Sequence, residues 1–332
     1  MIRLDHRNPM PEELRGAVVA LGNFDGFHQG HQAVVGEAIR WAQAEGRPAI
    51  VATFDPHPVR HFSPDAEPFR LTTLDQRQEL FAAAGADAML VFHFDDALAA
   101  MNAEGFVRDM IAGHVGAVGV VTGEDFTFGR RRGGNPAVLK QLGEPLGVSA
   151  RTVGAVHDAE GAISSSRIRE ALKGGDCETA TRLLTRPFTV RGAVQHGDKR
   201  GRTIGFPTIN IILEKGADPF RGIYAVKVRD AALKGNISWP GAGYFGDRPT
   251  FDTGRTFLEV YLIGFDGDLY GRNMLVEFID LIRPDRRFGS IAELVDQMRT
   301  DCGNTLTRLD ALKAENPVAG FPLGKLQAEG LL

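Results

Sequence analysis

Short apolar segments alternate with amphipathic ones over the first half of the chain. Apolar runs recur at residues 17–21, 48–53, 89–92, 118–122 and 149–153. Between them, apolar residues return at helical spacing in residues 31–44, 74–84 and 106–111. Short buried strands separated by amphipathic helices predict a parallel sheet that is covered on both faces. Ligands of such sheets bind beyond the carboxyl ends of the strands.

The pattern changes near Leu183. From there the apolar runs are separated by polar turns rich in Gly and Pro, and they lie at residues 188–194, 208–213, 223–228, 257–263 and 274–282. An amphipathic helix is predicted only after Ser290. Five or six strands followed by one helix predict a small antiparallel β-barrel with a C-terminal helix. We therefore predict an α/β protein with a Rossmann-like domain at 1–182 and a barrel domain at 183–332.

Composition narrows the class of protein. A chain of 332 residues is long enough for about two domains. Its formal net charge of −4 indicates neither a nucleic-acid partner nor an anionic membrane surface. Cys177 and Cys302 lie far apart, which argues against a disulfide framework and a zinc site. There is no apolar run long enough to cross a membrane, and residues 1–13 lack the apolar core of a signal peptide, so we expect a cytoplasmic protein. The oligomeric state is not predicted.

The segment GNFDGFHQGH at residues 22–31 lies at a predicted strand-to-helix junction. Backbone N–H groups and the helix dipole make such a junction an anion site. His28 and His31 can add hydrogen bonds to phosphate oxygens, and Gly30 keeps side-chain bulk away from them. The alternative is a Gly-rich turn with two surface histidines. The position at the junction favours a phosphate site.

A second segment, GDKRGRTIGFPTIN, occupies residues 197–210. Its glycines allow the backbone to approach a phosphate, and its basic side chains supply positive charge. The candidate phosphate-binding residues are Gly197, Lys199, Arg202 and Gly205. The segment is not a P-loop, because the Gly-Lys-Ser/Thr ending is absent. The alternative is a charged hairpin loop.

A Gly-x-Gly-x-x-Gly match at residues 241–246 does not indicate a dinucleotide site. The fingerprint requires a helix after the glycines, and Pro249 and Gly254 interrupt the chain there.

The N-terminal segment resembles the HxGH signature of the nucleotidyltransferase superfamily. In its wider form it is similar to the bifunctional riboflavin kinase/FAD synthetases of bacteria. The segments TFDPHP (53–58), GEDFTFG (123–129) and ISSSRIR (163–169) match that family in order and spacing. The resemblance extends from about residue 15 to residue 310, through the barrel segments 222–226, 248–251, 267–271 and 283–288.

The resemblance implies roles for residues of the N-terminal domain. ATP and its phosphates are expected at Gly22, Asn23, Phe24, His28, Gly30 and His31, with a second phosphate loop at Ser164, Ser165 and Arg169. The flavin is expected at Phe54, Pro56, His57, Pro58, Asp125, Phe126 and Phe128, where aromatic rings can stack on it. Ser166 stands where the family usually has Thr, but the hydroxyl is kept. The alternative for 163–169 is a Ser-rich helix cap, which is compatible with a phosphate site.

The same resemblance implies the residues of a kinase. Thr208 and Asn210 are expected to bind Mg²⁺ and ATP phosphate, and Glu259 is expected to be the catalytic glutamate. Ile209, Tyr244 and Gly264 stand where the family usually has Ala, Asn and Asp. We expect the kinase to be active, because neither Tyr244 nor Gly264 has an evident metal or proton role.

The implied function is FAD biosynthesis. Riboflavin would be phosphorylated by ATP to FMN, and FMN would be adenylated by a second ATP to FAD and pyrophosphate, with Mg²⁺ as the metal. Two other hypotheses remain open. One is a nucleotidyltransferase for pantetheine phosphate or nicotinamide mononucleotide, and the other is a non-catalytic flavin-binding regulator.

Overall fold

The chain forms two compact units. The computed structural model describes residues 1–63, 65, 70–197, 200–213, 216, 218–233, 235, 237–247, 256–314 and 317–329. One unit comprises residues 1–67 and 72–164, and the other comprises residues 68–71 and 165–332. Lys199 and the segment 248–251 lie outside the described residues.

The N-terminal unit contains a six-stranded parallel sheet in the order β1-β4-β3-β2-β5-β6. Its strands are β1 (Ile2–Asp5), β2 (Val18–Leu21), β3 (Ala49–Asp55), β4 (Ala88–His93), β5 (Gly119–Gly123) and β6 (Ser149–Val153). The predicted parallel sheet is confirmed. Only β1 was not predicted, because its four residues are too polar to stand out. After β2 the next two strands, β3 and β4, are added on one side of it, and β5 and β6 are added on the other side. The strand order therefore reverses between β2 and β5, and open α/β sheets bind ligands at such a point.

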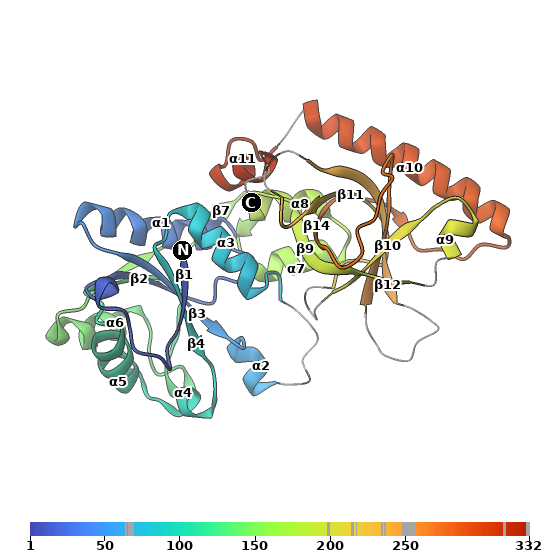
Figure 1. Ribbon diagram of the computed structural model, residues 1–332. Coiled ribbons are helices and arrows are strands. Elements are labelled where there is room, and N and C mark those ends of the chain that lie inside the picture. The colour runs from blue at the N-terminus through green and yellow to red at the C-terminus, as the bar shows by residue number, and fades with distance from the viewer. Residues whose placement is uncertain are drawn as a thin grey trace. The chain divides into compact units, whose positions relative to one another are not determined.

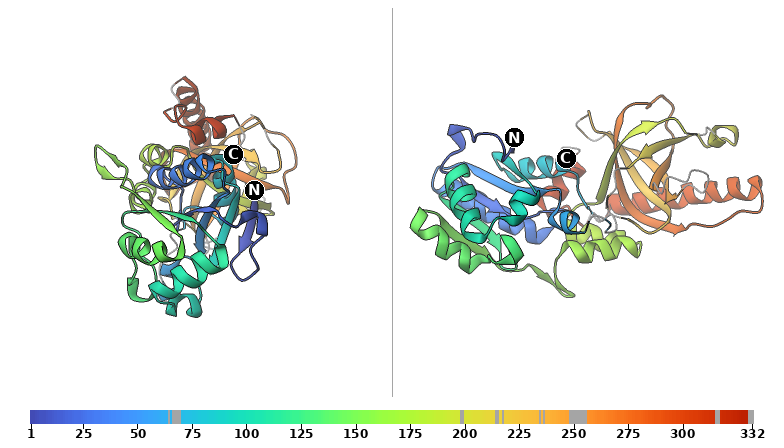
Figure 2. Two further views of the ribbon diagram at one scale, coloured as in Figure 1. Left: turned by 90° about the vertical axis from the view of Figure 1, so that its left-hand side faces the viewer. Right: turned by 90° about the horizontal axis from the view of Figure 1, so that it is seen from below.

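Helices cover both faces of this sheet (Figures 1 and 2). Helices α1 (Gln29–Ala44) and α3 (Leu74–Ala84) lie on one face, and the π-helix η2 (Phe106–Val115) and α6 (Pro136–Gly143) lie on the other. Trp41 of α1 packs so closely on β5 that a Cβ at Gly119 would lie 2.6 Å from its ring. The shorter elements are η1 (Glu12–Leu14), α2 (Pro58–Phe62), α4 (Asp96–Ala100), α5 (Ala103–Gly105), η3 (Arg130–Arg132), η4 (Glu144–Leu146), β7 (His157–Asp158) and β8 (Gly161–Ala162).

The second unit contains a closed antiparallel barrel in the order β10-β13-β12-β11-β14-β9. Its strands are β9 (Phe188–Gln195), β10 (Thr208–Ile212), β11 (Gly222–Asp230), β12 (Trp239–Asp247), β13 (Thr256–Leu262) and β14 (Asn273–Pro284). The predicted barrel is confirmed. The strand β12 was not predicted, because three glycines and Pro240 interrupt its apolar pattern. It contains the Gly-x-Gly-x-x-Gly match, so those glycines lie inside a strand of the barrel. Gly241 is needed for packing, since a Cβ there would lie 2.6 Å from Val260 Cγ1.

Helix α10 (Ile291–Ala314) lies along the outside of the barrel (Figures 1 and 2). Its Leu309 is buried against Ala225 and Ile279 of the barrel wall. Arg283 of β14 donates from Nε and Nη2 to the carboxylate of the buried Asp301, at 2.9–3.1 Å. The short helices α9 (Arg200–Thr203) and α11 (Pro322–Ala328) complete the unit.

Two helices before the barrel belong to the same compact unit. Helix α7 (Ser165–Lys173) is tied to the barrel unit through Leu172, whose carbonyl accepts a hydrogen bond from the N–H of Phe220 at 2.9 Å. Helix α8 (Cys177–Leu184) packs against β9 and β14. Burial raises the pKa of the Cys177 thiol to about 12, so this side chain is a neutral part of the core. The predicted boundary between two catalytic domains, at 182/183, stays a prediction.

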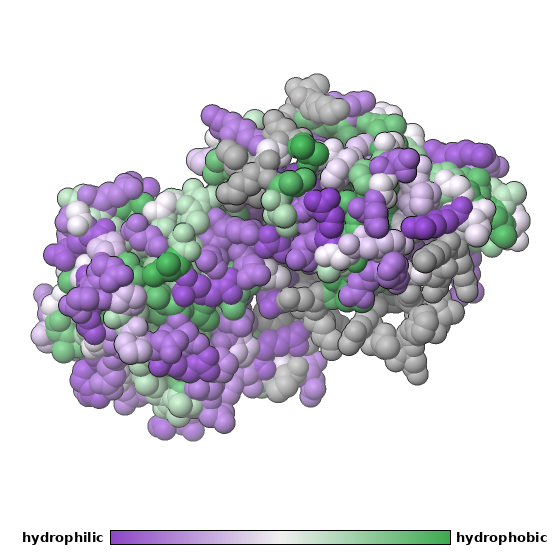
Figure 3. Space-filling view, in the orientation of Figure 1, coloured by the Kyte–Doolittle hydropathy of each residue, from purple (hydrophilic) through white to green (hydrophobic). Residues whose placement is uncertain are grey.

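The surface of the N-terminal unit that faces the viewer in Figure 3 is mostly hydrophilic, with small scattered apolar areas. In the described part of the chain, none of the helices combines the length and apolar character that a membrane span requires.

A barrel fragment that begins at residue 187 is expected to be less stable than one that begins at residue 165. It lacks α8, whose Leu183 and Leu184 are buried. Full burial of one leucine side chain contributes about 1.5–3 kcal/mol, so we expect a loss of several kcal/mol in urea unfolding. Within the longer fragment, Leu183→Ala should cost about 2–5 kcal/mol. The exposed Leu233→Ala is the control, with an expected change below about 0.5 kcal/mol. Equal urea midpoints for the two fragments would contradict this packing.

Two candidate active sites

The loop between β2 and α1 has a backbone conformation that most residues avoid. Phe24, Gly26 and Phe27 have φ of 50°, 83° and 48°. Left-handed conformations at non-glycine residues cost free energy and persist only where the surroundings enforce them. Here Phe24 and Phe27 are buried, and both rings pack edge-on against Phe81 of α3, at 5.9 and 5.0 Å between centroids. The aromatic packing therefore holds the turn that leads into α1.

This turn brings the two predicted histidines together at the start of α1. The rings of His28 and His31 stack with centroids 3.7 Å apart and planes 23° apart. His28 immediately precedes the first helical residue, so both rings lie at the start of the helix, where backbone N–H groups point out of its end. A Cβ at Gly30 would lie 3.1 Å from His28 Cε1 and 3.6 Å from the carbonyl oxygen of Ile163. The Ser-rich segment thus begins next to the histidine loop.

The residues of that Ser-rich segment are divided between the two units. Ser164 ends the N-terminal unit, whereas Ser165 and Arg169 belong to the second. Ser165 is the first residue of α7, and Arg169 follows one helical turn later on the same face. The predicted helix start is confirmed.

Two buried oxygens next to the histidine loop lack a hydrogen-bond partner among the described residues. They are Oδ1 of Asn23, just beyond β2, and Oγ1 of Thr122, on the neighbouring strand β5. Buried polar atoms without partners are rare in folded proteins, so these two need an explanation such as a ligand. Asn23 was predicted from the motif. Thr122 was not, because it ends a run that indicates only a buried strand.

The predicted flavin residues lie around the ends of β3 and β5. Phe54 and Phe128 are buried, and both contact the ring of Phe106, at 6.5 and 5.6 Å. Phe126 is half-buried and stacks on Phe128, with centroids 5.9 Å apart and planes 17° apart. Phe126 therefore has the most accessible of these three predicted rings. Asp125 beside it is exposed.

The turn after β3 contains the other predicted flavin residues. The Asp55–Pro56 peptide is cis. His57 caps α2, because its Nδ1 accepts a hydrogen bond from the N–H of Val59 at 3.2 Å. Pro58 is the first residue of that helix.

The barrel register places the predicted kinase residues in one row. Asn210 of β10 pairs with Glu259 of β13, and Glu259 pairs with Tyr244 of β12. Their neighbours Ile211, Leu258 and Phe245 fill the core. Because side chains alternate along a strand, the row Asn210–Glu259–Tyr244 faces outward, and Thr208 lies on the same face.

Gly197 and Gly201 lie close to Asn210 and Thr208 of this strand face. A Cβ at Gly197 would lie 2.4 Å from Asn210 Nδ2, so only glycine allows the backbone to come so close. The N–H of Phe206 donates to the Gly201 carbonyl at 2.8 Å and closes a tight loop. At the far end of the row, the Tyr244 hydroxyl donates to Asp285 Oδ2 at 3.0 Å.

A cavity of about 560 Å³ adjoins Thr208. Its walls include Val194, Leu262, Phe265 and Leu269, with Arg202 and Asp268 as charged groups. Arg202 Nη2 donates to the Tyr270 hydroxyl at 3.0 Å, and the Tyr270 ring packs on His196 with centroids 3.8 Å apart. The cavity thus joins an aromatic and apolar wall to a positive charge.

Gly264 and Gly205 both have the left-handed backbone that favours glycine, with φ of 75° and 85°. Gly264 lies just after β13, where the chain turns toward the cavity wall. This conformation explains why a glycine is suitable there.

Known proteins resemble the chain over nearly its whole length. The family described as FAD synthetase matches residues 10–167, and the family described as riboflavin kinase matches residues 184–309. The bifunctional riboflavin kinase/FMN adenylyltransferase of Escherichia coli K12 is 37% identical over 295 residues, which cover 88% of this chain and 91% of that protein. The protein of the same name from Bacillus subtilis 168 is 37% identical over 297 residues, covering 87% and 92%. A crystal structure described as a macrolide-efflux protein from Streptococcus pneumoniae superimposes with a TM-score of 0.81 at 31% identity, covering 92% and 99%.

Gly201→Ala is expected to open the loop that covers the barrel site. A Cβ at Gly201 would lie 2.2 Å from the carbonyl oxygen of Phe206, so the backbone must move. Overpacking of this kind costs about 1–3 kcal/mol. We expect a loss of this size in urea unfolding and a displaced 201–206 segment in the variant's crystal structure. Gly303→Ala on α10 is the control, because that site is open and alanine should stabilise the helix by about 0.5–1 kcal/mol. A Gly201→Ala variant with unchanged stability and loop position would contradict the tight closure.

Proposed function

The chain belongs to the family of bifunctional riboflavin kinase/FMN adenylyltransferases, and on that premise we propose which of its residues carry the two reactions. The enzyme phosphorylates riboflavin with ATP to FMN, and adenylates FMN with ATP to FAD. The observation that best supports an assignment is the stacked pair His28–His31 at the start of α1. No other helix in the described N-terminal unit has two imidazoles stacked at its start.

We place ATP for adenylyl transfer at the loop 22–31. An FMN phosphate oxygen attacks the α-phosphorus, the new P–O bond forms, and the bond to the departing pyrophosphate breaks. His28, His31 and the N–H groups of α1 would stabilise the charge that develops on the phosphates. The backbone of Gly22, Phe24 and Gly30 leaves room for them. Ser164, Ser165 and Arg169 would provide the second phosphate loop.

The unpartnered oxygens of Asn23 and Thr122 would be satisfied by ATP or by a water that it orders. Both lie at the point where the sheet order reverses, which favours a nucleotide there.

We place the flavin ring of FMN against Phe126, whose stacking partner Phe128 forms a rigid support. Phe54 would contribute to the apolar floor beneath it. The turn with Pro56, His57 and Pro58 would lie along the ring edge, and the exposed Asp125 would offer a hydrogen-bond acceptor.

For the kinase, we propose that Glu259 orients the riboflavin 5′-hydroxyl and accepts its proton as the hydroxyl oxygen attacks the γ-phosphorus. A carboxylate between Asn210 and Tyr244 on an outward strand face is open to a substrate. ATP would occupy the cavity beside Thr208, with Arg202 near the phosphates or the base. Gly197 and Gly205 would let the backbone approach the nucleotide, and Lys199 would add positive charge, as the sequence predicts.

Magnesium fits the barrel site. The Thr208 hydroxyl and the Asn210 amide oxygen are hard donors on one strand face beside a carboxylate, and Mg²⁺ prefers oxygen ligands shared between protein and phosphate. When bound, the ion neutralises charge on the phosphates during transfer. The protein's part is to hold these two side chains next to Glu259.

We also propose that the catalytic modules separate near 182/183. The match to the FAD synthetase family ends at residue 167, and the match to the riboflavin kinase family begins at residue 184, which supports this boundary.

The cytoplasm stays our predicted location, to be tested by fractionation. Incubation of the purified protein with riboflavin, ATP and Mg²⁺, with FMN and FAD resolved over time, is the first test of both reactions.

His31→Ala is expected to stop FAD formation while FMN still accumulates. The loss of one phosphate contact that forms in the transition state costs about 3 kcal/mol, which slows adenylation by at least about 100-fold. Kinetics with FMN and with riboflavin as substrates measure the two activities separately. Equal loss of both activities in a folded variant would argue against the assignment.

Glu259→Gln is expected to abolish riboflavin phosphorylation, because the amide cannot accept the proton. Adenylation of supplied FMN in the same variant is the internal control.

Tyr244→Asn, which restores the residue usual in the family, should change KM for riboflavin more than kcat, since Tyr244 has no proton or metal role. If the native chain makes no FMN and Tyr244→Asn restores it, the kinase is inactive as the chain stands and our assignment is wrong.

A further inference from the structure

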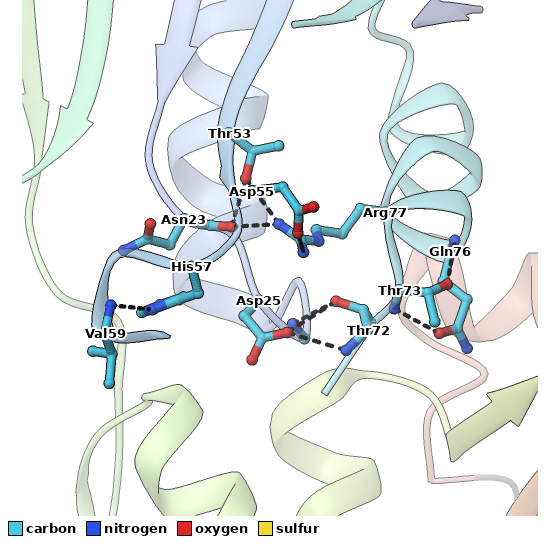
Figure 4. A network of polar contacts seen from close by, with 11 residues as sticks. Asn23, Asp25, Thr53, Asp55, His57, Val59, Thr72, Thr73, Gln76 and Arg77 are labelled. Carbon is cyan, nitrogen blue, oxygen red and sulfur yellow. Dashed lines mark hydrogen bonds and ion pairs between the residues drawn. The ribbon is translucent and has the colours of Figure 1, made fainter. Parts of the chain in front are cut away.

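Helix α3 is tied by side chains to both loops that we assign to substrates (Figure 4). At its start, the Thr72 N–H and hydroxyl donate to Asp25 Oδ1 at 3.0 and 3.2 Å, and Thr72 Oγ1 accepts from the Gly26 N–H at 2.9 Å. Asp25 and Thr72 are buried. These bonds fix the middle of the ATP loop just before His28.

Arg77, in the first turn of α3, contacts residues that follow β2 and residues of β3. Its Nη1 donates to the Asn23 carbonyl oxygen at 3.3 Å and to Thr53 Oγ1 at 3.0 Å. Its Nη2 lies 3.8 Å from Asp55 Oδ1. The side chain is only 2% exposed, so groups of the protein rather than water compensate its charge. Asn23 belongs to the ATP loop, whereas Thr53 and Asp55 lead into the flavin turn.

Arg77 is thus a single buried guanidinium with partners in both substrate loops. The planar fork of an arginine fixes the directions of its N–H groups, so partners bound to the same fork are held at a set spacing. Thr53 strengthens the link, because its hydroxyl also donates to the Asn23 carbonyl at 2.7 Å. Thr72 differs, since its bonds reach the ATP loop alone.

We infer that Arg77 is a positioning residue for adenylyl transfer: it sets the spacing between the ATP loop and the flavin turn. The FMN phosphate and the α-phosphorus must meet within reacting distance and in line, and an error of about 1 Å can cost about 100-fold in rate. Arg77 itself touches neither substrate. The inference rests on the proposed function of the two loops.

If Arg77 has this positioning role, its loss should lower the kcat of adenylation and leave the KM values for ATP and FMN unchanged. Each loop has its own contacts and should bind its substrate without Arg77. ATP is held by the histidine loop that Thr72 and the phenylalanine rings support, and FMN by the turn after β3. Only the relative placement of the two bound substrates depends on the guanidinium.

The test is the kinetics of FMN adenylation by Arg77→Met in the full-length chain. We expect kcat to fall about 100-fold, with the KM of adenylation for ATP and for FMN unchanged within about threefold. Riboflavin phosphorylation on the same chain should keep its rate, and unchanged affinity for ATP and FMN at the adenylation site shows that the N-terminal unit is folded. Arg3→Met is the matched control. Arg3 also contacts α3, through Gln78 at 2.8 Å and Asp75 at 2.5 Å, but on the exposed side, and its loss should leave both activities intact.

A second variant covers the case in which Arg77→Met does not fold. Arg77→Lys keeps the charge but cannot present two fixed N–H groups, so we expect a folded protein with kcat lowered about tenfold. Thr53→Val removes the shared hydroxyl. Its effect on kcat should not add to that of Arg77→Met, because the two residues act in one network.

Adenylation at the native rate in folded Arg77→Met, or in Arg77→Lys if the first variant is unfolded, would overturn the inference. So would a loss of kcat that is matched by loss of ATP or FMN affinity, since that indicates a binding defect. His31→Ala separates this failure from that of the proposed function. If His31→Ala stops adenylation and the Arg77 variants do not, only the positioning role is wrong.

Discussion

The hydrogen bonds between α3 and the ends of β2 and β3 hold together the part of the N-terminal unit on which its chemistry depends. The loop after β2 contains two phenylalanines in left-handed conformations, which an isolated chain would leave. Buried bonds from Thr72 to Asp25 and Gly26, together with ring packing on Phe81, compensate for that strain. The stacked histidines and the start of α1 follow directly from this turn. A loop that is costly to form is in this way kept in one conformation before any substrate arrives.

In the barrel the corresponding constraint is strand register. Because the barrel is closed, each strand is hydrogen-bonded to a neighbouring strand on both sides. Successive side chains along a strand point alternately to the core and to the outer surface, so the register decides which side chains are buried. Leu258 and Ile211 fill the core, so Glu259 and Asn210 must face outward together. A shift of one residue would bury the carboxylate and expose the leucine. The hydrophobic core therefore enforces the geometry of the polar row without any contact to substrate.

The two units prepare phosphate chemistry in different ways. The parallel sheet gathers loops at the carboxyl ends of its strands, and backbone N–H groups at a helix start provide much of the positive potential. The barrel instead uses the outer face of three strands, and glycines at 197 and 201 allow a loop to lie close against it. Each solution needs glycine where backbone must approach backbone or phosphate. This explains why the informative segments of the sequence are rich in it.

Local spacing along the chain determined much of this protein. The alternation of apolar runs and amphipathic helices was enough for the parallel sheet, and the change of pattern near Leu183 was enough for the barrel. The ordered motifs around His28 and Asn210 were enough for the family. These signals survive in sequence because strand alternation, helical periodicity and turn chemistry depend on residues a few positions apart.

Tertiary structure decided what depends on residues far apart. Arg77 lies within a predicted amphipathic helix, where an arginine is usually solvated, and only the packing of α3 on the sheet brings it to Asn23 and Thr53. Thr122 and the strand β12 gave no local signal either. Phe54 and Phe128 were predicted from the resemblance as flavin contacts, yet burial leaves Phe126 with the more accessible ring. The physical reason is common to all of them: which polar group meets which partner is set by the assembly of sheet, helices and barrel, and no spacing within one segment encodes it.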